Sequence, residues 1–183
     1  MPHIHTEPGQ HDHTASAFIV RTDTIRPHLL LHMHRKVGKL LQPGGHIELN
    51  ETPWGSIKHE LIEETGYAHD QLFLMQPPIR KLSSLTNAEI HPFPLCHNTH
   101  DYMPTGDHRH TDISYLFVTN QDPIGLPEEG ESTDFRWVTL DDLEKLDDSE
   151  IASNCRQIGT LALLIVENKE WIKESKSVAT WGK

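Results

Sequence analysis

The sequence predicts an α/β (α+β) sandwich in which a mixed β-sheet lies between helices. Three observations support this prediction. Short segments of apolar or alternating residues indicate strands, and they dominate the middle of the chain. Segments with helical periodicity follow the first strands and occur again near the end. The 183 residues are enough for one domain with a two-layer core, but fewer than two ordinary domains need.

The chain begins with a polar, His-rich stretch that has no periodicity. We therefore expect residues 1–14 to form a flexible arm, followed by a single domain at residues 15–183. Residues 17–21 and 28–34 are predicted to be two short strands. The turn between them at residues 23–27 favours antiparallel pairing.

A loop and a helix come next. The Pro-Gly-Gly sequence at residues 43–45 predicts a tight loop, with a short extended piece at residues 46–49. Thr52 and Pro53 are typical of a helix start, because a hydroxyl can cap the first turn and proline fits its first position. The helix should run to about residue 65, where Gly66 supplies a left-handed cap.

The second half of the chain is less regular. Residues 76–109 are rich in Pro, His and Asn and predict a long excursion with one strand at residues 88–95. Residues 111–119 predict a central strand, because apolar side chains occur on both of its faces. A short strand at 135–138 and a short acidic helix at 139–146 follow. A last helix is predicted at residues 158–173, with one apolar face formed by Leu161, Leu164, Ile165, Asn168 and Ile172.

Composition excludes several classes of protein. The formal net charge of −11 argues against a nucleic-acid polymer as partner, because binding phosphates needs a basic surface. No apolar run is long enough to span a membrane or to form a signal peptide, so we expect a soluble, cytoplasmic protein. Cys96 and Cys155 are too few for a disulfide framework. Whether the chain forms a homodimer is left open.

Histidine is unusually abundant, with 15 residues. Several lie at the start of the chain, and others, including His97, His100, His108 and His110, lie in its middle. We favour solvated loop histidines over a transition-metal site, and the second interpretation stays open.

Three glutamates carry the functional argument. Glu60, Glu63 and Glu64 stand at positions i, i+3 and i+4 of the predicted helix, so their carboxylates share one face. An acidic helix face is most often simply solvated. Like charges at this spacing repel one another, however, and no Lys or Arg separates them, so a hard cation would suit the cluster better.

Residues 45–67 resemble the Nudix box, which consists of a glycine, five residues, Glu, seven residues, Arg-Glu, an aliphatic residue, any residue, Glu-Glu, any residue, Gly and an apolar residue. Every fixed position matches except one, since His59 replaces the usual Arg. The flanking segments 29–46, 109–115 and 135–143 are similar to other parts of the family. The resemblance covers about residues 15–146 and implies the Nudix α/β/α sandwich, with the box as a loop-helix-loop.

The resemblance also implies roles for the residues of the box. Glu60 and Glu64 would be the main ligands of Mg²⁺ or Mn²⁺, supported by Glu63 and the carbonyl of Gly44. Gly45, Glu51 and Gly66 would be structural. A glutamate outside the box would supply a further ligand or the general base, and Glu131 is our first choice, with Glu129 second.

Other site residues follow from local geometry. His59 lies one helical turn before Glu63, so we expect it to orient that carboxylate and not to bind metal. Alternation along the predicted strand places His108, His110 and Asp112 on one face. We group His110, Asp112 and the box residue His46 as substrate-binding candidates. Whether His110 and Asp112 contact substrate phosphate or metal, or only bond to neighbouring loops, stays open.

The resemblance implies a metal-dependent hydrolase that cleaves a diphosphate bond in a nucleoside diphosphate-linked or related small molecule. Two alternatives stay open. A prenyl-diphosphate isomerase would need a well-placed catalytic cysteine, which the sequence does not offer. A non-catalytic, nucleotide-binding sensor would typically have lost glutamates that this box retains.

Overall fold

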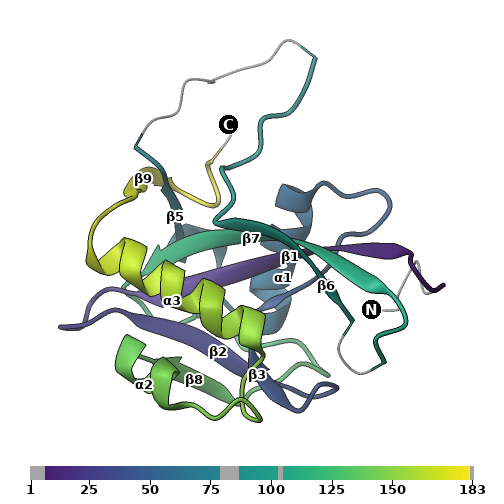
Figure 1. The fold of residues 1–183 in the computed structure, drawn as a ribbon. Coiled ribbons are helices and arrows are strands. Elements are labelled where there is room, and N and C mark those ends of the chain that lie inside the picture. Colours follow the sequence, from purple (N-terminus) through teal and green to yellow (C-terminus); the bar gives the residue numbers. More distant parts are fainter. Residues whose placement is uncertain (1–6, 79–86, 103–104, 182–183) are drawn as a thin grey trace.

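The computed structural model describes residues 7–78, 87–102 and 105–181 (Figure 1). The ordered elements, in chain order, are β1 (His11–Arg21), β2 (His28–His34), β3 (Lys39–Leu41), β4 (Gly44–His46), α1 (Pro53–Thr65), the 3₁₀ turn η1 (His69–Gln71), β5 (Phe73–Gln76), β6 (Cys96–Asp101), β7 (Arg109–Thr119), β8 (Phe135–Val138), α2 (Leu140–Lys145), α3 (Ser153–Glu167) and β9 (Ile172–Ser177).

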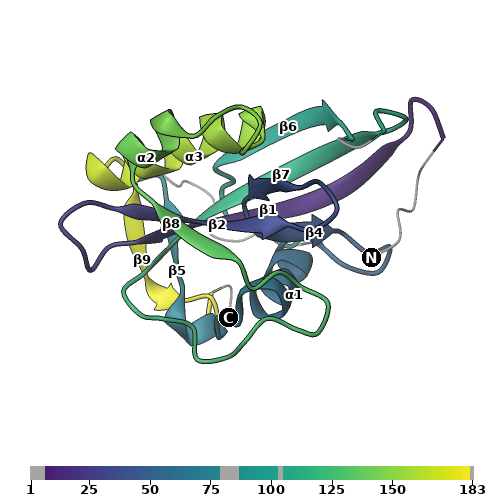
Figure 2. The same ribbon diagram turned by 90° about the horizontal axis from the view of Figure 1, so that it is seen from below.

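The sheet is mixed and lies between helices. In the described part of the chain its main path runs β3-β2-β1-β7-β5-β9, while β4 pairs with β1, β6 with β7 and β8 with β2. The central strands β1 and β7 are parallel, and the other pairs are antiparallel. Figure 2 shows α2 and α3 on one face of the sheet and α1 on the other. The predicted mixed α/β sandwich is confirmed.

Each central strand has a polar first half and an apolar second half. In β1, Phe18 and Val20 pack on the side of α3, and Ala17 and Ile19 pack on the side of α1. The earlier part of the same strand carries polar side chains instead. Because β7 runs parallel to β1 and in register, its polar half lies beside the polar half of β1. Two apolar cores therefore lie on opposite faces at one end of the sheet. Polar side chains cover the other end.

Helix α1 forms as its sequence signals predict. The Thr52 hydroxyl accepts a hydrogen bond from the Gly55 amide, and Pro53 occupies the first turn. Gly66 ends the helix with φ 71°, a left-handed conformation that suits glycine. Trp54, Ile57 and Leu61 are buried against the sheet.

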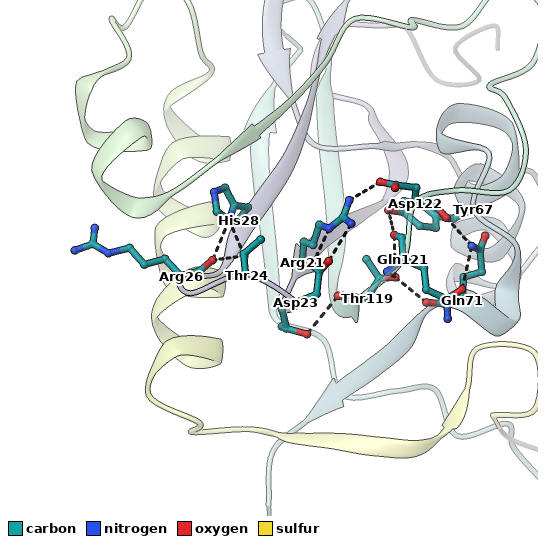
Figure 3. Close-up of polar contacts among 11 residues, drawn as sticks. Arg21, Asp23, Thr24, Arg26, His28, Tyr67, Gln71, Thr119, Gln121 and Asp122 are labelled. Atoms are coloured by element: carbon teal, nitrogen blue, oxygen red, sulfur yellow. Dashed lines mark hydrogen bonds and ion pairs between the residues drawn. The ribbon is translucent and has the colours of Figure 1, made fainter.

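Polar contacts join the segment after α1 to the C-terminal ends of β1 and β7 (Figure 3). Tyr67 donates its hydroxyl to the Gln121 carbonyl at 2.9 Å, and Gln71 donates to the Asp122 carbonyl at 2.7 Å. Arg21 pairs with Asp122 as well as with Asp23. These contacts fix α1 relative to β1 and β7.

Two predictions in the first part of the chain need correction. The flexible arm expected at residues 1–14 is wrong for residues 11–14, which belong to β1, while residues 1–6 lie outside the described part. The polar sequence of residues 11–14 gave no strand signal because its side chains do not join an apolar core. The strand expected at residues 88–95 is also wrong, because the strand of this segment is β6, at Cys96–Asp101. Its sequence is polar, and pairing with β7 stabilises it.

The last predicted helix is wrong in its bounds and in its face. Helix α3 ends at Glu167, and residues 172–177 form β9, which pairs with β5. Leu161 and Leu164 are 43% and 37% exposed. The buried stripe consists of Cys155, Gly159, Ala162, Leu163 and Ile165. At Gly159 an added Cβ would lie 2.6 Å from Leu29, so a glycine allows close packing on the sheet there.

Within the described residues, no helix combines the length and apolar character required to cross a membrane.

Candidate active site

A pocket of ≈ 260 Å³ lies over the polar end of the sheet. Its floor is the polar half of β1 and β7, one wall is β4 with the glutamate face of α1, and another wall is the turn after β2. The pocket therefore collects most of the residues that the sequence analysis selected. These are Gly44, Gly45, His46, Glu60, Glu63, Glu64, His110, Asp112 and Glu131.

The two glycines of β4 let α1 approach the sheet. A Cβ at Gly45 would lie 2.0 Å from Glu60 Oε1, and a Cβ at Gly44 would lie 2.3 Å from the Ala15 carbonyl oxygen. Gly44 also has a φ of 146°. Its amide donates a hydrogen bond of 2.7 Å to Glu64 Oε2. Gly44 requires glycine because of its φ and its contact with the backbone of β1, whereas a side chain at Gly45 would displace the Glu60 carboxylate.

Two carboxylates of α1 are buried together. Glu60 is 4% exposed and Glu64 is 7% exposed. Burial, and then the charge of Glu63, raises the pKa of Glu60 to about 7. Burial also raises the pKa of Glu64 well above its ordinary value, although the bond from the Gly44 amide opposes this effect. Without a cation these groups resist ionisation, so the pocket favours binding one.

The loop between β7 and β8 adds a further carboxylate. The Glu131 side chain lies within hydrogen-bonding reach of Glu64 and lines the pocket. Glu128 and Glu129 are exposed and do not line it. Of the neighbouring glutamates considered from the sequence, the structure therefore brings Glu131 to the box.

His59 joins two glutamates at the edge of the site. Its Nε2 lies 2.5 Å from Glu63 Oε1, and its Nδ1 lies 3.3 Å from Glu51 Oε1. Burial lowers the pKa of His59, but the charges of Glu63, Glu51 and Glu60 together outweigh burial and raise it above its ordinary value. A protonated imidazole can donate to both carboxylates, so His59 links the loop residue Glu51 to the helix.

Comparison with known proteins identifies the family. A sequence model of the NUDIX domain matches residues 11–155. The chain belongs to the Nudix family. A NUDIX-family hydrolase from Clostridium perfringens is 30% identical, with a TM-score of 0.66 over 85% of this chain and 97% of that one. No curated protein sequence matches this chain.

More distant solved structures share the fold. The C. elegans Ap4A hydrolase has a TM-score of 0.57 at 18% identity, over 86% of this chain and 98% of that chain. The NUDIX domain of Shewanella oneidensis NrtR, solved with ADP ribose, has a TM-score of 0.59 at 15% identity, over 83% of this chain and 86% of that chain. Family membership and the Clostridium relative together show that the chain is a Nudix-type pyrophosphohydrolase.

The Nudix pocket contains no cysteine among its lining residues. Cys155 lies in the first turn of α3 and is buried, and burial raises the pKa of its thiol to about 12. A thiol held in this neutral form is a poor nucleophile or acid-base group. The described pocket therefore lacks the cysteine that the isomerase alternative requires.

Asp112 accepts three side-chain hydrogen bonds at the floor of the pocket. Its carboxylate accepts hydrogen bonds from the hydroxyls of Thr14 at 2.9 Å, Ser16 at 2.7 Å and Ser114 at 2.6 Å. Burial raises its pKa, although the three hydroxyls oppose this. Gln42 in turn donates to the Ser16 hydroxyl at 3.0 Å. The structure therefore places Asp112 where it orients polar groups facing the pocket.

Several residues in or next to the pocket were not predicted from the sequence. His32 is 2% exposed, and its Nε2 lies 4.0 Å from Glu64 Oε2. Arg35 and Lys36 bring positive charge to an otherwise acidic site. Asp12 is buried near His46 and His110. The sequence does carry signals for the first three, namely a histidine directly after the apolar segment Leu29–Leu31 and two basic residues at a turn. Asp12 fell in the predicted flexible arm.

Proposed function

We propose that the chain hydrolyses a diphosphate bond in a nucleoside diphosphate-linked or related small molecule, with Mg²⁺ or Mn²⁺ at the glutamates of α1. The burial of Glu60 and Glu64 side by side carries the proposal. Two carboxylates in so little water need a compensating positive charge, and oxygen-only donors suit these hard ions.

Each residue of the site would have its own role in hydrolysis. Glu60, Glu64 and the Gly44 carbonyl would hold the cation, with Glu63 beside them. A bound divalent ion would neutralise charge developing on the phosphates and polarise the bond to be broken. His59 would hold Glu63 in place through the 2.5 Å contact. Glu131 would serve as a further ligand or accept a proton from the attacking water.

Two basic residues of the pocket lining support an anionic substrate. Arg35 and Lys36 line the same pocket as the glutamates, and Arg35 donates a 2.8 Å hydrogen bond to the Gly130 carbonyl. Guanidinium and ammonium groups bind phosphate oxygens that a metal leaves uncovered. A pocket of ≈ 260 Å³ suits a small molecule and excludes a polymer duplex from its floor.

The test is a screen of nucleoside diphosphate compounds with Mg²⁺ and Mn²⁺, scored by phosphate release after phosphatase treatment. On the best substrate, Glu64→Gln should lower turnover by at least about 100-fold at saturating metal, since it removes a charged ligand. Glu131→Gln should lower turnover more than Glu129→Gln, a matched control at an exposed position.

The alternative of a non-catalytic sensor defines the result that would contradict hydrolysis. A sensor would bind nucleotides without turnover, and the glutamate variants would then change binding only. If wild type releases no phosphate from any compound yet binds one of them, the sensor function replaces the hydrolase. Near-normal turnover in Glu64→Gln would contradict the role of the box glutamates.

A further inference from the structure

A second cluster of ligand-type side chains lies in the pocket beside the box glutamates. One ligand atom each from Asp12, His46 and His110 lies within 4.8 Å of the other two. His46 and His110 line the pocket, and the Asp12 side chain is buried behind them. His108 approaches the same carboxylate, with Nε2 3.8 Å from Asp12 Oδ2.

The sheet register explains why these residues meet. Asp12 of β1 lies directly opposite His110 of β7, which in turn lies opposite His100 of β6. Directly opposed residues in a sheet project from the same face. His46 of β4 lies opposite Thr14, two residues after Asp12 and therefore on the same face. Four strands thus bring one carboxylate and three imidazoles together.

The spacing of the cluster is close to that of ligands around one metal ion. His46 Nε2 lies 3.6 Å from Asp12 Oδ2. Nitrogen and oxygen ligands at about 2.0–2.1 Å from a tetrahedral ion lie about 3.3–3.4 Å from one another. Small side-chain rotations would bring the three ligand atoms to that spacing.

The ligand set differs in kind from that of the box. Imidazole nitrogen favours zinc, cobalt, nickel and copper, whereas Mg²⁺ prefers oxygen ligands throughout. Two imidazoles and a carboxylate are the ligands of many catalytic zinc sites, which keep at least one position for water or substrate. That position would face the pocket here, because His46 and His110 line it.

We propose that Asp12, His46 and His110 form a transition-metal site for Zn²⁺ or a similar ion such as Co²⁺. The site is separate from the box glutamates but opens into the same pocket. Its free coordination position takes an anionic oxygen, such as one from a phosphate group. Of the middle histidines expected to be solvated, His110 is thereby assigned to a metal, while the exposed His97 stays outside the site; His46, expected to bind substrate, becomes a ligand.

The test is Co²⁺ binding to the metal-stripped protein in excess Mg²⁺, which fills oxygen-only sites. The visible d–d absorption of Co²⁺ reports the number of ligands, and Zn²⁺ competition reports selectivity. Wild type should bind one equivalent with an intense four-coordinate spectrum. His46→Ala with His110→Ala should weaken binding by at least about 100-fold. His97→Ala is the matched control on β6 and should bind like wild type.

Two comparisons keep the test decisive. Thermal unfolding in EDTA should be similar for wild type and for a milder variant, His110→Gln, so that loss of Co²⁺ in that variant reports a lost ligand and not a lost fold. Glu64→Gln should keep the Co²⁺ equivalent while losing hydrolysis, which separates this site from the proposed function. Absence of the Co²⁺ equivalent in wild type, or its survival in the double alanine variant, would overturn the proposal.

Discussion

Replacing Glu60 by glutamine should stabilise the metal-free protein while abolishing activity. Burial, and then the charge of Glu63, raises the pKa of Glu60 from 4.5 to about 7. Each pKa unit corresponds to about 1.4 kcal/mol, so ionising Glu60 in the folded protein lowers the free energy of unfolding by about 3 kcal/mol. Glutamine keeps the shape of the side chain and removes the charge, and so removes this cost.

The sign of the effect depends on pH. The folded state keeps the Glu60 proton to a higher pH than the unfolded state, so wild type loses stability as pH rises from about 4.5 to about 7. Above pH 7 the loss is complete. Glu60→Gln should therefore match wild type near pH 4 and exceed it by up to about 3 kcal/mol at pH 8.

Urea denaturation in EDTA at both pH values measures the difference. Glu144→Gln, at an exposed position of α2, is the control and should follow wild type. Adding Mg²⁺ should then stabilise wild type more than Glu60→Gln, because the ion offsets the buried charge that only wild type carries. A Glu60→Gln variant no more stable than wild type at pH 8 in EDTA would refute this account of the buried carboxylates.

Three further predictions concern neighbouring positions. His59→Ala should lower kcat/KM about ten- to thirtyfold through the lost contacts with the two glutamates, whereas His59→Arg should keep most activity; equal activity of wild type and the alanine variant would make His59 a bystander. His32→Leu should raise the free energy of unfolding in EDTA at neutral pH by about 1–2 kcal/mol, because neither ring nitrogen of the buried, neutral His32 makes a hydrogen bond of good geometry among the described residues; a less stable variant would contradict this. Gly44→Ala should lower the melting temperature strongly because its Cβ would meet the Ala15 carbonyl, and Gly55→Ala, with only a 3.3 Å contact, is the tolerated control.

Local signals in the sequence determined helix α1 and the chemistry of its face. The Thr52 cap, Pro53 and Gly66 act within one or two turns of the backbone, so neighbouring residues alone specify where α1 begins and ends. The spacing of the glutamates then follows from helix geometry. Strand β2 and the central position of β7 were predictable for the same reason, since their apolar residues mark them as buried on both faces.

Pairing between distant segments decided what the sequence alone could not. Strands β6 and β9 carry polar sequences, and they are strands because β7 and β5 supply hydrogen-bond partners. The sequence favoured Glu131 over Glu129, but the contact of Glu131 with Glu64 depends on how one turn meets α1. Such contacts leave no periodic pattern in the residues that make them.

The pocket floor shows most clearly what the sequence alone could not predict. Thr14 and Asp112 share a hydrogen bond across 98 residues of sequence, and Asp12 meets His110 by the same parallel register. A shift of one residue in that register would turn Asp12 and Thr14 away from the pocket, because side chains alternate between the faces of a strand. The sequence determined which chemical groups the chain carries, and the register of β1 on β7 decided which of them meet.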